Sequence, residues 1–159
     1  MFNYTSSVGY PGIFLHDCTV TRVRVEGRDV VLELDDGFWI GADNPQNPFG
    51  KLHRTDKSEL RFVGADLEDC FTAVHNKLHI RGSTTSIRHE VSFASFASKI
   101  NRGIWRFEAV NEYYTGRSAM LCGYLRRGKY PYYGSEAQLE MRHESLQYSW
   151  NKVREDRPW

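Results

Sequence analysis

One short segment gathers the residue types that most often recognise a partner. It holds three cations and three tyrosines, namely Arg126, Arg127, Lys129, Tyr130, Tyr132 and Tyr133. Arg and Tyr are favoured anchors at protein interfaces. The same mixture binds single-stranded nucleic acid, because tyrosines stack on bases while cations contact phosphates. A third interpretation is structural, with a hairpin loop whose tyrosines cover the edge of the core.

The charge balance favours a protein partner over nucleic acid. The chain has 21 Lys and Arg residues against 20 Asp and Glu residues, which gives a net charge of +1. Binding along a phosphate backbone needs several positive charges gathered on one surface. We therefore expect another protein as the partner. The proline-containing segment Ala42 to Gly50 is the second part of the expected binding surface.

His16 and Cys18 are the candidate residues of a small pocket. On an extended chain, residues two apart share a face, so these side chains could lie together with Asp17 directed away. An imidazole can activate a thiol as a nucleophile. The structural interpretation carries more weight, because a cysteine that opens a regular strand packs most simply into the core. We assign no catalytic residue.

His75 and His79 are the pair nearest to metal-ligand spacing. On a helix, residues four apart lie on one face at metal-ligand spacing, but Asn76-Lys77 between them favours a turn. The chain also lacks the glycine-rich loops that hold nucleotide phosphates. We therefore expect neither a metal nor a cofactor.

Apolar and polar side chains alternate along most of the chain, and the elements that they form must position these candidate residues. Such alternation is typical of half-solvated strands. Asp36-Gly37 is a hairpin signal, so the first three expected strands form a meander. Gly82 to Ser86 is expected to be a loop of small residues. The expected strands cover residues 18–26, 30–35, 38–40, 59–63, 70–80, 104–114, 118–125, 137–142 and 146–150.

A single helix is expected over Phe93 to Ile100, where apolar residues recur at helical spacing. Ser92 is its expected N-cap, and Gly103 its C-terminal stop. The fold class is therefore mostly β, an antiparallel sandwich or barrel of about eight or nine strands with one short helix. The alternative is an α+β fold in which Ala65 to Asn76 is helical.

The 159 residues suit a single domain, with a loosely held segment at 1–11 and a polar tail at 151–159. No apolar stretch is long enough to span a membrane. The start of the chain has no signal-peptide pattern, and three cysteines without a CxxC pair fit a reducing compartment. We expect a cytoplasmic protein. A homodimer is one arrangement that would cover its edge strands.

Several short motifs resemble those of a group of bacterial domains. They are Leu15-His16-Asp17-Cys18, Asp36-Gly37-Phe38-Trp39-Ile40, Phe93 to Ile100, Trp105 to Glu108 and Glu112-Tyr113-Tyr114. Together they resemble small uncharacterised bacterial domains that open with a Leu/Phe-His-Asp strand. Some similar domains are regarded as immunity proteins, which bind and neutralise a partner toxin. The resemblance implies binding rather than catalysis.

The leading hypothesis is a non-enzymatic protein-binding module, immunity-like or accessory. One alternative is a small-ligand binder or hydrolase that uses the mouth of a β-barrel near His16 and Cys18. A second alternative is a protein that binds single-stranded nucleic acid.

Overall fold

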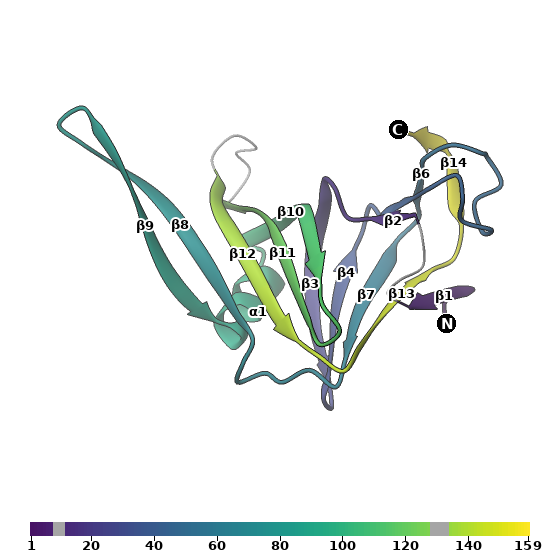
Figure 1. Cartoon of the computed structure of the whole chain (residues 1–159), viewed down its shortest axis with the longest axis horizontal. Helices are drawn as coiled ribbons and strands as arrows, with labels where there is room; N and C mark the ends of the chain where they lie inside the picture. Colours follow the sequence, from purple (N-terminus) through teal and green to yellow (C-terminus); the bar gives the residue numbers. More distant parts are fainter. Residues whose placement is uncertain (8–11, 128–133) are drawn as a thin grey trace.

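The computed structural model describes residues 1–7, 12–127 and 134–159, and these fold into strands and one helix (Figure 1). Ten strands form one sheet and four short strands form a second, with antiparallel pairing throughout. The prediction of a mostly β, antiparallel fold with one short helix is confirmed. The described residues contain fourteen strands rather than eight or nine.

The large sheet runs across the whole molecule. Its spatial order is β1 (Tyr4–Ser7), β13 (Ser145–Trp150), β7 (Ser58–Val63), β4 (Asp29–Leu34), β3 (Cys18–Glu26), β10 (Trp105–Tyr114), β11 (Ser118–Arg127), β12 (Gly134–Arg142), β8 (Phe71–Ile80) and β9 (Ser83–Ser92). Within the described residues the sheet does not close into a barrel, because β1 and β9 are its two end strands.

The second sheet lies at the end of the molecule opposite the β8–β9 hairpin (Figure 1). Its order is β14 (Val153–Pro158), β6 (His53–Thr55), β5 (Trp39–Ile40) and β2 (Ile13–Phe14). Phe38 packs edge-on against Tyr148 and Trp150 of the large sheet, with ring centroids 5.5 Å apart in both pairs. Residues of both sheets and of the helix therefore belong to one hydrophobic core.

Several hairpins form where alternation predicts them. Gly27, with a φ of 64°, lies in the turn between β3 and β4. The segment 115–117 joins β10 to β11, and β12 follows on the other side of β11. In β10, β11 and β12 the apolar half of the alternation faces the core, whereas Val25 near the end of β3 is 49% exposed.

The predicted meander is wrong in its third strand. Gly37 turns the chain with a φ of 73°, and a Cβ atom there would overlap the Asp56 carbonyl oxygen. Phe38 donates its N–H to Thr55 Oγ1 (3.0 Å) and accepts from the Thr55 N–H (2.9 Å). The chain after Gly37 therefore joins β6, and β7 takes the place beside β4.

Both ends of the described chain contribute strands, one within the segment expected to be loosely held and one within the expected polar tail. β1 pairs with β13, and β14 pairs with β6. Residues 8–11 of the predicted loose segment lie outside the described residues. The α+β alternative is also wrong, because most of the segment offered as a helix is a turn followed by β8.

The helix α1 (Phe93–Asn101) packs against β3, β8, β9 and β10. Ser92 caps it by accepting the Ser95 N–H (3.4 Å), and Gly103 follows its end with a φ of 68°, as predicted. Asn101 binds the backbone of Val23 through two hydrogen bonds of 2.8 Å, one to the N–H and one to the carbonyl oxygen. The side chain thus continues the ladder of β3 beyond its last pairing with β10. With nine residues, this single helix of the described chain is too short to cross a lipid bilayer.

Candidate protein-binding surface

The β8–β9 hairpin projects from the body of the molecule (Figure 1). β8 pairs with β12 only as far as His75, and β9 is the last strand of the sheet. Every residue from 77 to 90 is exposed, and we call this segment the arm. Both edges of the arm are unpaired by any described residue, so their backbone donors and acceptors face solvent.

The arm has one apolar face. Leu78, Ile80 and Ile87 are 42%, 54% and 49% exposed and lie on the same side, because Leu78 is opposite Thr85 and Asn76 is opposite Ile87. Val74 is on this side too, and it is buried in the core. The apolar face of the arm is therefore the core-facing side of the sheet, continued beyond the elements that cover it.

Polar contacts fix the base of the arm. Ser135 Oγ donates to Asn76 Oδ1 (2.7 Å), and the Asn76 amide nitrogen lies 3.3 Å from His89 Nδ1. Lys77 forms an ion pair with Glu136 (3.2 Å). These contacts join the first residues of the arm to β12, so the arm leaves the body in a defined direction.

The arm was not anticipated, and two predictions about it are wrong. Asn76-Lys77 is not a turn but the middle of β8, and Gly82 to Ser86 is not a loop but mostly β9. The true turn is Arg81-Gly82, where both residues have positive φ values of 48° and 82°. A two-residue turn of this kind matches the twist of the flanking strands. The signal was present in the alternation of Leu78 and Ile80 before Gly82, but polar residues on the other face obscured it.

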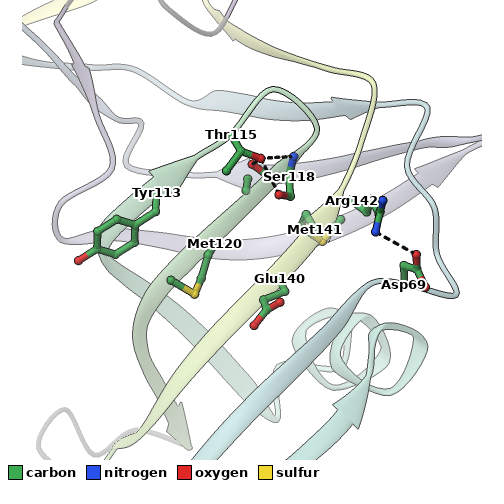
Figure 2. Close-up of a pocket in the computed structure, with 9 residues that line it drawn as sticks. Asp69, Tyr113, Thr115, Ser118, Met120, Glu140, Met141 and Arg142 are labelled. Carbon is green, nitrogen blue, oxygen red and sulfur yellow. Dashed lines mark hydrogen bonds and ion pairs between the residues drawn. The ribbon is translucent and has the colours of Figure 1, made fainter.

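The opposite side of the sheet carries two shallow hollows. The first, about 320 Å³, lies over β10, β11 and β12, where Tyr113, Met120 and Glu140 stand side by side (Figure 2). Asp69 and Arg142 form an ion pair (3.5 Å) at its rim. It offers an aromatic ring, a thioether and charged groups of both signs, which suits a side chain of a partner protein.

The second hollow, about 230 Å³, adjoins the first on the same side of the sheet and includes His75, Cys122, Tyr124 and Glu136. His75 Nε2 is buried there and has no hydrogen-bond partner among the residues that the structure describes. Burial raises the pKa of the Cys122 thiol, which keeps it protonated and a poor nucleophile. Among the described residues, no three side chains of the metal-binding types gather into a site.

The predicted cation and tyrosine segment is described only in part. Arg126 is at the end of β11 and donates from Nη2 to Glu108 Oε1 (2.6 Å), beside the second hollow. Arg127, the last residue of β11, is exposed. The other predicted residues, Lys129, Tyr130, Tyr132 and Tyr133, lie outside the described residues.

The segment Ala42 to Gly50 lies elsewhere, between β5 and β6 of the second sheet and far from the end of β11 (Figure 1). Asn47 is buried and donates from its amide nitrogen to the carbonyl oxygens of Ile40, Gly41 and Lys51. Asn44 is also buried and accepts the Gln46 N–H (2.9 Å). The hydrogen bonds of these two buried asparagines hold the loop in one conformation.

His16 and Cys18 are close in sequence but have separate partners. His16 Nδ1 donates to the Val110 carbonyl oxygen (2.9 Å), and its Nε2 lies 3.4 Å from Asp17. Cys18 is fully buried, and burial raises the pKa of its thiol to about 12, against the opposing effect of the Arg54 cation. A thiol with such a pKa stays protonated at neutral pH and is a weak nucleophile.

Neighbouring residues show what holds this turn in place. Both carboxylate oxygens of Glu112 accept the Leu15 N–H, at 3.1 and 3.0 Å. Burial raises the pKa of Glu112, although the Leu15 N–H and His16 act in the opposite direction. Nearby, the hydroxyls of Tyr114 and Tyr148 lie 2.6 Å apart, and burial raises the pKa of both. This buried polar cluster joins the turn at Leu15 to β10.

Comparison of the chain with protein-family models, with curated proteins and with solved structures found no match in any of the three.

Proposed function

We propose that this chain is a non-enzymatic protein-binding module, immunity-like or accessory, which holds its partner by the arm. The observation that carries the proposal is the continuity between the buried core side of β8 and the exposed side chains of Leu78, Ile80 and Ile87. An apolar strip that leaves the body of a protein is costly to expose to water unless a partner covers it. Three free cysteines fit a reducing compartment, so the cytoplasm is the proposed location of this module.

The arm offers a partner two kinds of contact. Within the described residues the arm has unpaired edges, whose backbone N–H and carbonyl groups can pair with an added strand. Its apolar face adds burial on one side of that strand. The hollows over β10 to β12 lie on the other side of the sheet and leave room for a second contact.

Two features favour binding over catalysis. Cys18 and Cys122 both have a raised thiol pKa, which is the opposite of what a cysteine nucleophile needs. The hollows are shallow, whereas sites for small substrates bury most of the ligand surface.

Site-specific photo-crosslinking tests the proposal. A photoreactive amino acid is placed at Thr85, on the apolar face of the arm, in the chain expressed in its own cells. The matched position is Thr21 on β3, a half-buried residue of the sheet far from the arm. We expect discrete protein adducts from position 85 and none from position 21.

A further substitution tests whether the apolar face is responsible. Leu78→Ser and Ile87→Ser together are expected to abolish the adducts, because they remove the buried apolar contact but leave the strand backbone intact. If position 85 gives no discrete adduct, or if the adducts persist in the double variant, the arm is not the binding element and the proposal is wrong. The mass of each adduct shows whether the crosslinked partner is a different protein or a second copy of this chain.

A further inference from the structure

We infer that a second copy of this chain occupies the free edge of the arm, by antiparallel pairing of the two β9 strands about a twofold axis at His89. The inference rests on the proposed protein-binding role of the arm and names its partner. It follows from three properties of β9: its unprotected edge, the order of its residues, and the registers that this order forbids.

The edge of β9 lacks the usual protections against pairing. The strand is ten residues long, contains neither proline nor glycine, and pairs with β8 without a bulge. Edge strands of monomers are usually short, bulged, covered or interrupted by proline. The two charged residues of β9, Arg88 and Glu90, neutralise each other through an ion pair of 2.7 Å.

The residues of β9 read as a chemical palindrome around His89. Ser86 and Ser92 are the outer pair, Ile87 and Val91 the next, and Arg88 and Glu90 flank His89 directly. When two such strands pair antiparallel with His89 opposite its own copy, Arg88 faces the partner's Glu90 and Ile87 faces the partner's Val91. Directly opposed charges of unlike sign and opposed apolar side chains both stabilise a strand pair.

Other registers lose this match. A shift that centres the axis on Arg88 places Arg88 opposite the partner's Arg88, and one centred on Glu90 opposes two carboxylates. A register centred on Ile87, nearer the turn, leaves Arg88 opposite Ser86 and Glu90 opposite Thr84. Any register offset by one residue puts the apolar faces of the two arms on opposite sides of the joined sheet. The palindrome therefore specifies one register.

The same register extends the apolar face. Because residues of equal parity pair, the strips containing Leu78, Ile80 and Ile87 in the two copies lie on the same side of the joined sheet. Thr85 falls opposite the partner's Phe93, so each turn Arg81-Gly82 reaches past the strand of the other copy to the beginning of its α1. The apolar face near the turn then lies on the side of the sheet that α1 covers.

Charge reversal is the first test. Sedimentation equilibrium of the unmodified chain is expected to show a dimer that dissociates on dilution. Arg88→Glu or Glu90→Arg alone places like charges opposite each other twice per dimer, and each is expected to weaken dimerisation at least about tenfold. The double variant R88E/E90R restores unlike charges and is expected to regain most of the affinity. Arg117→Glu, in the exposed turn between β10 and β11, is the control that leaves the dimer unchanged.

Disulfide trapping tests the register directly. His89→Cys brings two thiols opposite each other, with Cα atoms about 4.5–5.5 Å apart, which lies within the range of a disulfide. Mild oxidation is expected to convert this variant to a covalent dimer. Thr85→Cys is the matched control on the same face, and its two copies lie about 27 Å apart along the strands. The unmodified chain gives the background from its own three cysteines.

The outcomes separate this inference from the proposed function. A chain that remains monomeric at about 100 μM, or a dimer that ignores the charge reversals and traps at position 85 rather than 89, overturns the pairing of β9. In that case crosslinks from Thr85 to another protein still support a protein-binding arm. If the arm gives no adduct of any mass, both are wrong.

Discussion

Gly123 lies opposite Ala109, where β10 carries a bulge and its pairing with β11 shifts by one residue. A Cβ atom at Gly123 would overlap the Glu108 carbonyl oxygen and lie 3.0 Å from the Ala109 Cα atom. These are backbone atoms, so they can give way only if the strand moves. The bulge also presents the Val110 carbonyl oxygen to His16, so this glycine serves the turn at residues 15–18 as well.

Gly123→Ala is therefore expected to lower the free energy of unfolding by about 1–3 kcal/mol or more, as overpacking does. Urea denaturation followed by tryptophan fluorescence measures the change. Gly116→Ala is the control, because Gly116 is exposed and its Cβ site has open space around it. We expect the control to stay within about 0.5 kcal/mol of the unmodified chain. Equal effects of the two substitutions would contradict the close approach of β10 and β11.

At the scale of elements, the contact between α1 and β3 depends on one side chain. β3 pairs with β10 over only three residues, and Asn101 then takes the place of a strand beside Val23. Two partly buried backbone groups of Val23 have the Asn101 amide as their partner.

Asn101→Ala is expected to destabilise the protein by about 1–3 kcal/mol, since it leaves those two groups without a partner. Alanine favours helix more than asparagine, so helix propensity alone would change stability in the opposite direction. Ser98→Ala, at an exposed position of the same helix, is expected to be neutral or slightly stabilising. Thermal denaturation of the two variants is the comparison. If Asn101→Ala left the thermal stability unchanged, the hydrogen bonds from Asn101 to Val23 would not contribute to folding as proposed.

The elements that the sequence predicts well share one property, which is a clear division between a buried and a solvated face. Phe107 and Ala109 in β10, Leu139 and Met141 in β12, and Phe96 in α1 are buried at the positions that the spacing predicts. Three strands of the second sheet, β2, β5 and β6, have only two or three residues, too few for alternation to be recognised. The local pattern also could not show which strand pairs with β4. Phe38 forms a hydrogen bond to Thr55, which lies 17 residues later in the sequence, and this contact directs the chain to β6.

The candidate surface was predictable only in part. Types of residue that suit recognition were found near Arg126, and the structure places that residue in an ion pair with Glu108. The arm was not predicted, because its apolar side chains are spaced among threonines, serines and charged residues. Whether a face of a strand is covered also depends on where the other elements of the fold pack. Alternation shows which side chains share a face, but not whether that face is covered.

At the scale of the molecule, stability is distributed unevenly along the large sheet. β4 lies between β3 and β7, and residues 30–34 are all buried. No described strand pairs with the outer edges of the arm, and all residues of the arm are exposed. Local opening is easiest where few contacts must be broken.

Native-state hydrogen exchange of the dilute, monomeric chain is expected to follow this difference. Amides of residues 77–90 should exchange at least about a thousandfold faster than those of β4, because only the latter need global unfolding. Mass spectrometry of peptic fragments resolves the two segments. Comparable protection of both in the monomer would mean that the arm is held by something other than the contacts at its base.

The pairing of β1 with β13 has a consequence for how the chain is made. Thr5 Oγ1 and Ser149 Oγ lie 3.2 Å apart although 144 positions separate them in the sequence. A ribosome delivers Tyr4–Ser7 well before Ser145–Trp150, so β1 has no neighbour to join until β13 has followed it. The hairpin of β10 and β11 can close as soon as it leaves the exit tunnel, whereas the edge of the sheet at β1 must wait until β13 has been synthesised.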